Sequence, residues 1–366
     1  MNVYNSLKRL LITHVLNFKK RFMEFNLKMN TRKAIKETNR KNNTAQLKPE
    51  EVQQAKAYFK SKGYNLQNTY WHSYYKSISG EFYPNYIPED IFSAIISPKF
   101  NEMRQWPALL DKNLSYALFK EVNQPVKVVQ NINGFYYVDN KIVSEAIAVK
   151  VCNNHNKPFV IKPTIDSGNG IMVESFRIKN NRTTYKNLET IDLFRLYKKD
   201  FIVQEHVEQS SAMKELNPSS LNTLRLMSYL KPDGVHILSS VIRIGQPGHH
   251  TDNFSGGGIV CGIDPKGNLK HKGYSKNGNV YTETHTHVSF KGFQIPNYSK
   301  VLDMVKTMHP KVPYFKFISW DIGINDNEFP VFIEYNTYYQ DVDLHQITNG
   351  PLFGEFTDEI LSLGLK

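Results

Sequence analysis

The chain has 366 residues, of which 40% are apolar and 22% are charged, proportions typical of a soluble globular protein with a large core. Its two cysteines, Cys152 and Cys261, have no spacing typical of a metal site or a redox pair, and a pair of cysteines excludes a disulfide-rich scaffold. No apolar run reaches the roughly 18–20 residues that a transmembrane helix needs.

Positive charge is concentrated at the N-terminus. The formal net charge is +12, and residues 1–42 carry eleven lysines and arginines against two glutamates, a net charge of +9. The rest of the chain therefore carries only +3, which argues against a nucleic-acid groove as its main surface.

Residues 1–28 are predicted to form an amphipathic helix, because apolar side chains recur at three- and four-residue steps from Leu7 to Phe25. Basic residues flank this stripe, so the helix either docks on the protein core or lies on an anionic membrane surface. A secretory signal is disfavoured, because a basic cluster follows the apolar run and no small-residue cleavage site is present. Residues 29–47 are polar and are predicted to be a linker. We expect a cytoplasmic protein in which residues 1–42 are the part that would contact a membrane.

The next part, residues 48–108, is predicted to be a helical layer rich in aromatic residues. A helical pattern ends at Gly63, and Pro88 precedes the acidic start of another helix. Trp71 and His72 are interpreted as packing residues. Residues 109–366 mix helical and strand patterns and predict an α+β domain.

Two lysines of this domain are candidates for binding an anion. Lys112 opens a helix predicted over residues 111–122, and Lys162 ends a strand predicted over residues 157–163. A Ser/Gly-rich loop, residues 164–170, follows and leads into another strand. Glycine lets backbone amides approach an anion that a lysine neutralises, although a lysine beside a glycine turn is usually only the end of a hairpin. The Walker A and GxGxxG nucleotide motifs are absent.

Two arginines lie in the next predicted strands. Residues 201–207 form an apolar strand with a polar end, and residues 222–231 and 235–244 are predicted to form a hairpin that carries Arg225 and Arg243. Each arginine either serves a site or forms a salt bridge on a sheet face.

The most informative stretch is a second hairpin, with strands predicted over residues 315–324 and 329–336. If Asn325 pairs with Pro330 across a four-residue loop, Asp321 lies directly opposite Glu334. Because side chains alternate along a strand, Asn336 then lies on the same face as Glu334.

Facing carboxylates repel each other by up to about 1 kcal/mol, so a chain keeps them most readily when a divalent cation lies between them. Oxygen ligands of this kind suit Mg²⁺. The alternative is a solvated hairpin face on which Asp321 and Glu334 form an accidental acidic pair.

The order of these features resembles the ATP-grasp superfamily from Asp111 to about Asp341. The residues that carry the resemblance are Asp111-Lys112, IKP at 161–163, and the spacing of Asp321, Glu334 and Asn336.

A closer resemblance, over Lys48 to Lys366, is to the sugar-transfer-associated ATP-grasp group, which is linked to cell-surface polysaccharide synthesis. It rests on WHSYY (71–75), YIPEDIF (86–92), SSLNTLRL (219–226), DNFSGGGIVCGID (252–264) and IEYNTYYQDVDLHQITNGPLFG (333–354).

This resemblance implies an α+β ATP-grasp fold in which two subdomains clasp ATP, with a flap subdomain at about 150–207 and a catalytic subdomain at about 208–366. It implies ATP and Mg²⁺ as ligands. The implied phosphate contacts are Lys112 and Lys162, with a flap loop that includes Ser167, Gly168 and Gly170. The implied adenine edge consists of Gln204, Glu205 and Val207, and the implied Mg²⁺ ligands are Asp321, Glu334 and Asn336.

The chemistry implied is a ligation in which ATP activates a carboxylate as an acyl phosphate and an amine displaces the phosphate. Many such ligases place an arginine two residues before the metal-binding aspartate, where this chain has Ser319. Arg225 or Arg243 must then stabilise the oxyanion, or the reaction differs. Candidates for binding the acceptor are Asn222, Asp252, Gln340, Asp341 and His345, and packing is an equal alternative for the last three.

The leading hypothesis is therefore a ligase that joins a small-molecule carboxylate to an amino sugar or glycan precursor, without a nucleic-acid partner. A kinase on the same scaffold and a non-catalytic partner of glycosyltransferases are the alternatives.

Overall fold

The computed structural model describes residues 22, 24–165, 167, 170–338 and 340–365. Its contacts divide the chain into two compact units, one comprising residues 1–102 and 338–366 and the other residues 103–337. These limits differ from the division expected from the sequence, because the C-terminal residues group with the N-terminal helices.

The first unit is helical. Its elements are a helix over residues 24–41, then α2 (Pro49–Ser61), α3 (Tyr70–Ser79), α4 (Glu89–Ile91), the π-helical turn η1 (Phe92–Ile96), α5 (Ser97–Phe100), α12 (Val342–Asn349), the 3₁₀ turn η6 (Gly354–Phe356) and α13 (Thr357–Gly364). None of the helices in the described part of the chain is both long and apolar enough to span a membrane.

The linker predicted over residues 29–47 is wrong as far as residue 41, because that stretch is helical. Leu27 and Ile35 lie two turns apart on this helix and are buried, and Arg32 forms an ion pair of 2.6 Å with Asp90. Packing contacts therefore outweigh the polar composition that indicated a linker. Most of the amphipathic helix predicted over residues 1–28 lies outside the described residues.

The aromatic residues of this unit form its core, as predicted. Trp71 and His72 are buried on α3, and the ring centroids of Tyr75 and Tyr86 lie 4.9 Å apart. Burial lowers the pKa of His72 to about 4, so this side chain is neutral at physiological pH and packs as an aromatic ring.

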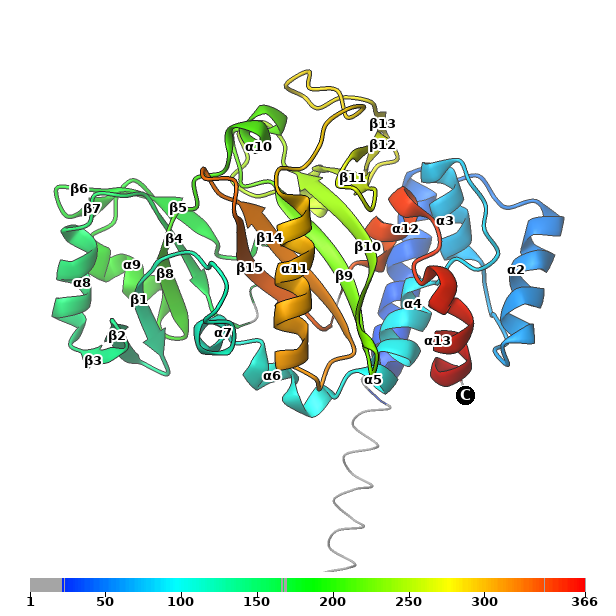
Figure 1. The fold of residues 1–366 in the computed structure, drawn as a ribbon, viewed down its shortest axis with the longest axis horizontal. Helices are drawn as coiled ribbons and strands as arrows, with labels where there is room; N and C mark the ends of the chain where they lie inside the picture. The colour runs from blue at the N-terminus through cyan, green and yellow to red at the C-terminus, as the bar shows by residue number, and fades with distance from the viewer. Residues whose placement is uncertain (1–21, 23, 166, 168–169, 339, 366) are drawn as a thin grey trace, which may run out of the picture. The chain divides into compact units, whose positions relative to one another are not determined.

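The second unit begins with a six-stranded sheet in the order β3-β2-β1-β8-β4-β5. Its strands are β1 (Lys127–Ile132), β2 (Phe135–Val138), β3 (Lys141–Val143), β4 (Phe159–Pro163), β5 (Glu174–Phe176) and β8 (Phe201–Glu205). The helices α8 (Glu145–Asn153) and α9 (Thr190–Tyr197) pack on this sheet through a shared apolar core (Figure 1). The sheet thus starts about twenty residues before the flap boundary expected at 150.

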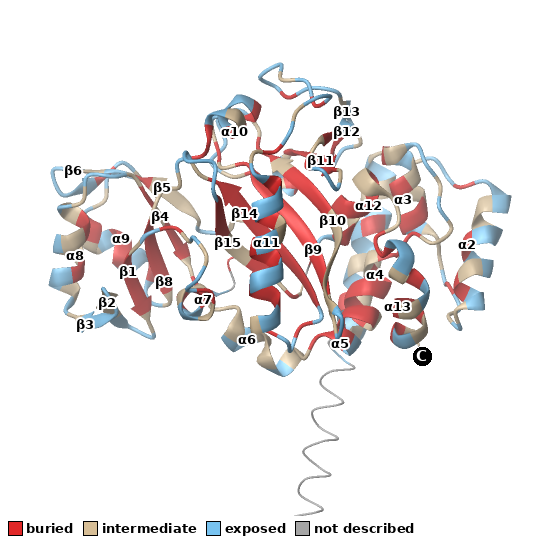
Figure 2. Ribbon diagram, in the orientation of Figure 1, coloured by how far each residue is buried: buried red, intermediate tan, exposed pale blue. Residues whose placement is uncertain are grey.

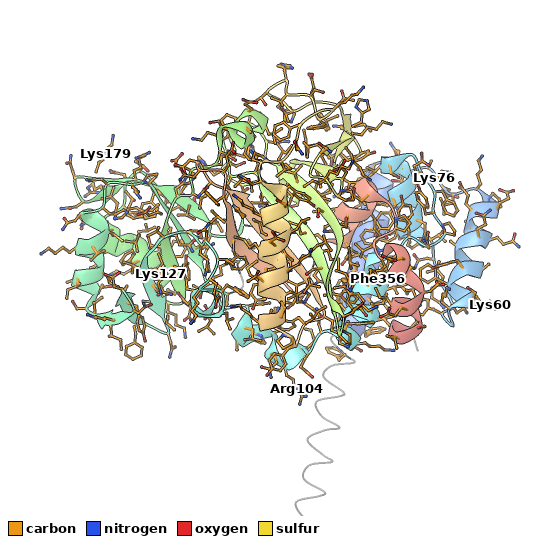
Figure 3. The ribbon with its side chains drawn as sticks, in the orientation of Figure 1. Lys60, Lys76, Arg104, Lys127, Lys179 and Phe356 are labelled. Atoms are coloured by element: carbon orange, nitrogen blue, oxygen red, sulfur yellow. The ribbon has the colours of Figure 1, made fainter. Side chains whose placement is uncertain are left out.

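The second unit also contains several short elements. They are η2 (Met103–Gln105), α6 (Trp106–Leu109), α7 (Lys112–Leu118) and the hairpin of β6 (Ile178–Lys179) and β7 (Arg182–Thr183). Lys179, at the tip of that hairpin, points away from the protein (Figure 3).

A seven-stranded sheet in the order β13-β12-β11-β10-β9-β14-β15 completes the second unit. Its strands are β9 (Thr223–Lys231), β10 (Gly234–Ile244), β11 (Ile259–Ile263), β12 (Leu269–Ser275), β13 (Val280–Tyr281), β14 (Phe317–Ile324) and β15 (Pro330–Asn336). The remaining helices are α10 (Ser211–Leu216), α11 (Tyr298–Met308), η4 (Phe254–Gly256) and η5 (His309–Lys311).

Helix α11 covers one face of this sheet and turns its buried side toward it (Figure 2). Along β9, Leu224 and Leu226 belong to the core beneath α11, so the alternate residues Thr223 and Arg225 face the opposite side. The candidate site lies on that opposite side.

The β14–β15 hairpin places Asp321 opposite Glu334, as predicted, but by a different route. The register beside the turn is shifted by one residue from the one assumed, since Ile324 rather than Asn325 pairs with Pro330, and a β-bulge at Ile333 then restores it. The bulge arises because Phe332 and Tyr335, three residues apart, are both in the core, a spacing that strict alternation does not allow.

Candidate nucleotide and magnesium site

Charged side chains form a row across four neighbouring strands on the sheet face opposite α11. Arg243 on β10 pairs with Thr223 on β9, Arg225 on β9 pairs with Asp321 on β14, and Asp321 pairs with Glu334 on β15. Directly opposed residues point to one face, so the sheet itself brings both predicted arginines and both predicted carboxylates together.

Asp321 is fully paired with the two arginines. Its Oδ1 and Oδ2 accept from Nε and Nη2 of Arg225 at 2.8 Å each, and Oδ2 also accepts from Nη2 of Arg243 at 3.1 Å. Burial raises the pKa of Asp321, but the two guanidinium charges and a contact with Glu334 outweigh it and hold the pKa below its ordinary value. The carboxylate is therefore ionised.

Lys112 connects the carboxylates to the glycine loop. Asp111 caps helix α7 by accepting from the backbone N–H of Asn113, which fixes the start of the helix where Lys112 stands. The Lys112 ammonium donates to Oγ of Ser167 at 2.9 Å and lies 3.3 Å from Oε2 of Glu334. One predicted phosphate lysine thus contacts both the predicted flap loop and a predicted metal ligand.

Lys162, the second predicted phosphate lysine, is buried on β4 with only 6% of its surface exposed. Burial and the neighbouring charge of Lys112 lower its pKa to about 8, while Glu334 and Asp321 act in the opposite direction. Among the described residues, none forms a hydrogen bond or ion pair with its ammonium group. A buried cation without a partner is costly, so this position is suited to an anion that arrives from outside.

The predicted adenine edge lies at the end of β8. The side chain of Gln204 is buried and donates to the hydroxyl of Tyr116, and the side chain of Glu205 pairs with His155 and Lys157. Val207 follows the strand, and its backbone N–H makes no backbone hydrogen bond within the described part of the chain. Of the three residues, Val207 therefore has the backbone N–H that is best suited to donate a hydrogen bond to the edge of a nucleotide base.

Two of the three predicted flap residues, Ser167 and Gly170, are among the described residues. Gly168 lies outside the described residues, whereas Gly170 has φ +71° and its Cα lies so close to Asn253 that a Cβ would approach Nδ2 of Asn253 to 2.9 Å. The left-handed backbone conformation favours glycine there.

The residues proposed to bind the acceptor are divided between the two compact units. Asn222 is buried, and its side-chain amide donates to Gln209 and to the backbone carbonyls of Met213 and Asn217, so it stabilises a loop. Gln340, Asp341 and His345 belong to the other compact unit, where Gln340 and His345 are buried, and their role in acceptor binding stays a prediction.

Asp252 belongs to the charged row rather than to an open pocket. It accepts from the backbone N–H of Thr223 at 3.1 Å and from the Thr223 hydroxyl, and it lies 3.4 Å from Nε of Arg243. Sequence reasoning missed Thr223, although its place two residues before Arg225 on one strand was a usable signal.

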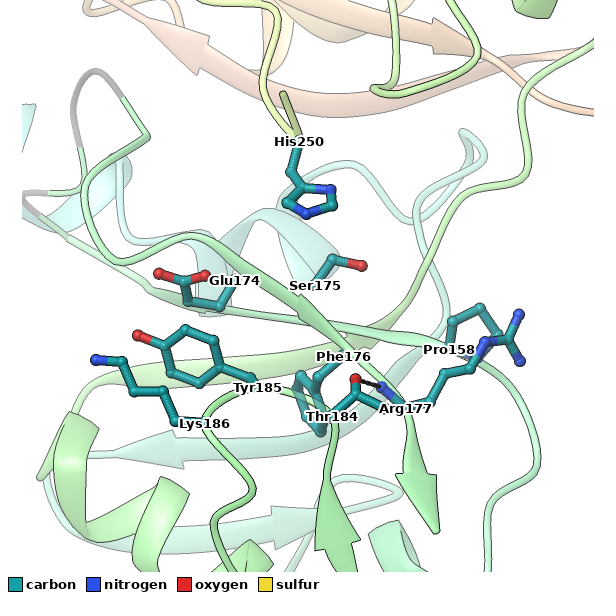
Figure 4. A pocket seen from close by; sticks show the side chains of 9 residues that line it. All are labelled: Pro158, Glu174, Ser175, Phe176, Arg177, Thr184, Tyr185, Lys186 and His250. Atoms are coloured by element: carbon teal, nitrogen blue, oxygen red, sulfur yellow. Dashed lines mark hydrogen bonds between the residues drawn. The ribbon is translucent and has the colours of Figure 1, made fainter. Parts of the chain in front are cut away.

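A separate groove of about 410 Å³ lies beyond the edge strand β5 (Figure 4). It is lined by Pro158, Glu174, Ser175, Phe176, Arg177, Thr184, Tyr185, Lys186 and His250. Arg177 and Lys186 point to opposite ends of it, so its cations do not converge, and none of the predicted site residues lines it.

A family model described as sugar-transfer associated ATP-grasp matches residues 92–359, about three quarters of the chain. The chain belongs to this family. The expected ATP-grasp fold and the closer of the two resemblances are thereby confirmed, although the match begins at Phe92 rather than Lys48. No curated protein matches the chain significantly.

Solved structures that resemble this family member include several ligases. The ATP-grasp ligase PsnB, complexed with a phosphomimetic variant of a minimal precursor, Mg and ADP, has 13% identity and a TM-score of 0.40, over 72% of this chain and 61% of PsnB. D-alanine–D-alanine ligase from Bacillus anthracis complexed with ATP has 10% identity and a TM-score of 0.38, over 70% and 64% of the two chains. VanG D-Ala:D-Ser ligase from Enterococcus faecalis has 13% identity and a TM-score of 0.40, over 70% and 60%.

This chain therefore spans about 60–64% of the length of those ligases. At this level of similarity they carry no information about its substrates.

ATP and Mg²⁺ are the ligands implied by the ATP-grasp family, and the donor set of this site fits the metal. Glu334 is 31% exposed in its side chain and lies beside the ionised Asp321. Within the described part of the chain, no three His, Cys, Asp or Glu side chains lie so that they could hold a metal ion together, and the role of Asn336 as a third oxygen ligand stays a prediction. The arginines occupy both oxygens of Asp321, so Glu334 is the more accessible ligand of the pair.

Proposed function

We propose that the chain is an ATP- and Mg²⁺-dependent ligase that joins a carboxylate to an amine on a sugar or glycan precursor. The observation that carries the proposal is the buried ammonium of Lys162, which forms no hydrogen bond or ion pair with a described residue, beside Lys112 and two facing carboxylates. The description of the family as sugar-transfer associated is the support for a sugar substrate in this proposal.

Each residue of the site has a defined role in this mechanism. Lys162 and Lys112 bind the phosphates, and the amide of Val207 donates to the adenine edge. Glu334 and Asn336 would hold Mg²⁺ together with the remaining lone pair of Asp321. When bound, Mg²⁺ supplies neutralisation of the phosphate charge.

The substrate carboxylate attacks the γ-phosphorus, the bond to the β–γ bridging oxygen breaks, and ADP leaves. The amine then attacks the acyl carbon, and phosphate leaves with the electron pair of its C–O bond while the amine gives up a proton. A guanidinium group on the same face stabilises the negative charge that develops in both steps.

The direct test is incubation of the protein with ATP, Mg²⁺ and mixtures of amino acids and amino sugars, with ADP and phosphate assayed and products identified by mass spectrometry. A ligase releases ADP together with inorganic phosphate and forms an amide. A stable phosphate ester without free phosphate would instead identify a kinase, and the absence of any nucleotide turnover would favour a non-catalytic partner of glycosyltransferases.

Nucleotide binding should also take up a proton. The pKa of Lys162 is lowered from 10.5 to about 8, so above pH 8 the free protein increasingly holds the neutral amine, and phosphate binding restores the charge. Affinity for Mg²⁺ and a non-hydrolysable ATP analogue should therefore fall as pH rises from 8 to 10, by up to about tenfold per unit. Calorimetry in buffers of different ionisation enthalpy measures the uptake, and equal heats in all buffers at pH 9 would refute it.

A further inference from the structure

The two arginines that contact Asp321 have different structural surroundings. We propose that Arg243 is the arginine that contacts the reacting anion, that Asp252 and Thr223 position it, and that Arg225 is a fixed counter-ion of Asp321. This inference rests on the proposed function and decides which guanidinium replaces the arginine that is missing at Ser319.

Arg225 forms a tight, buried ion pair with Asp321. The side chains are 4% and 1% exposed, and Nε and Nη2 of Arg225 make two parallel bonds of 2.8 Å to the two carboxylate oxygens. A bidentate pair at this depth is held by its geometry, and separating it would leave a buried charge on each side. Arg225 therefore keeps Asp321 ionised and in place.

Arg243 is bound less tightly to Asp321 than Arg225 is. Its side chain is 11% exposed, and it shares Asp321 through a single bond of 3.1 Å from Nη2. Nε and Nη2 also donate to Oγ1 of Thr223, at 3.1 and 2.7 Å. Its Nη1, which can donate two further hydrogen bonds, donates to no residue in the described ranges. Arg243 therefore has donors left for an incoming anion.

Asp252 and Thr223 both contact Nε of Arg243. Asp252 lies 3.4 Å from Nε of Arg243 and is itself fixed by the backbone N–H and hydroxyl of Thr223. The loop that carries Asp252 is closely packed, because a Cβ at Gly258 would lie 2.9 Å from the carbonyl oxygen of Ile244. This packing fixes the carboxylate, and the carboxylate fixes the guanidinium.

The position of Arg243 in the charged row agrees with this role. The row runs from Lys112 through Glu334 and Asp321 to Arg243, so Arg243 stands at the end farthest from the phosphate lysine along these contacts. In a nucleotide held by Lys112 and Lys162, the end beyond the metal ligands is the end at which the γ-phosphoryl group reacts.

The experiment compares the binding of Mg²⁺-ADP with that of Mg²⁺-ADP plus fluoroaluminate, a mimic of the transferring phosphoryl group, by calorimetry. The proteins are the wild type, Arg243→Lys, Arg225→Lys, Asp252→Asn and the Arg243→Lys/Asp252→Asn double variant, each checked for folding by circular dichroism and thermal melting. This probe needs no knowledge of the carboxylate or the acceptor.

Arg243→Lys should weaken the fluoroaluminate complex by about 100-fold while ADP affinity changes less than about twofold, as expected for a donor aimed at developing charge. Asp252→Asn should weaken it by about tenfold, and this loss should vanish in the Arg243→Lys background, because a positioning residue acts only through its arginine. Arg225→Lys should give the largest fall in Tm, because it loosens the buried pair with Asp321.

Several outcomes would overturn the inference. It fails if Arg225→Lys selectively weakens the fluoroaluminate complex and Arg243→Lys does not, if the Asp252→Asn loss persists in the double variant, or if the wild type binds ADP without any gain from fluoroaluminate. A wild type that does not bind Mg²⁺-ADP at all would instead overturn the proposed function.

Discussion

Glu334→Gln should reduce ATP turnover by about 1,000-fold, because the variant removes the accessible carboxylate that would hold Mg²⁺ against the phosphates. Glutamine keeps the size of the side chain and its hydrogen-bonding capacity, so the fold should remain intact. The loss of charge also leaves Lys112 without its 3.3 Å partner, which should not by itself weaken phosphate binding. Release of ADP from ATP under saturating Mg²⁺ measures the effect.

The matched control is Asp326→Asn. It makes the same carboxylate-to-amide change in the same hairpin, at an exposed position in the turn between β14 and β15. Turnover by this control should equal that of the wild type. Unchanged turnover in Glu334→Gln would remove Glu334 from the metal site.

Lys162→Met should have opposite effects on stability and on nucleotide binding. In the free protein the lysine is buried beside Lys112, no described residue forms a hydrogen bond or ion pair with it, and its pKa is lowered from 10.5 to about 8. Because folding depresses this pKa, the charged lysine destabilises the folded state at neutral pH, and this cost disappears as pH rises above 10.5. At pH 7 methionine should therefore stabilise the free protein, by about 3 kcal/mol at most.

The same variant should bind Mg²⁺ and a non-hydrolysable ATP analogue about 10–100-fold more weakly, because it loses a charge-assisted hydrogen bond to phosphate. Thermal melting and calorimetry on one preparation measure both effects. Lys150→Met, on the exposed side of α8, is the control and should change neither. A Lys162→Met protein that is less stable and binds the analogue normally would show that the lysine has a structural role only.

The alternation of apolar and polar residues was sufficient to predict that the two hairpin carboxylates face each other. It did not predict the strand pairing that brings them into this position. Asp321 lies opposite Glu334 only because a one-residue shift in register beside the turn and a bulge at Ile333 compensate for each other. The three-residue spacing of Phe332 and Tyr335 indicates the bulge. It can be interpreted in this way only once both residues are known to pack beneath α11.

For the residues proposed to bind the acceptor, the sequence did not reveal the contacts of each side chain. Asp252 was predicted to bind a substrate from its place in a glycine-rich string, yet it is engaged by Thr223 and Arg243 from neighbouring strands. Asn222 is engaged in a loop. A string of residues identifies a loop near a site, but the partners of each side chain depend on which strands become neighbours.

The sequence by itself determined which chemical groups this protein can bring to a nucleotide, namely a lysine at a helix start, a lysine before a glycine loop, two arginines on adjacent strands and a carboxylate pair on a hairpin. These are local patterns, fixed by the two-residue period of a strand and by turn residues. The tertiary structure alone decided that Lys162 is buried with no neutralising partner among the described residues. It also decided that Arg225 is bound tightly to Asp321, whereas Nη1 of Arg243 donates to none of the residues that the structure describes. The reason is that Arg225 and Asp321 stand 96 residues apart in the chain, and only the order of strands in the sheet makes them neighbours.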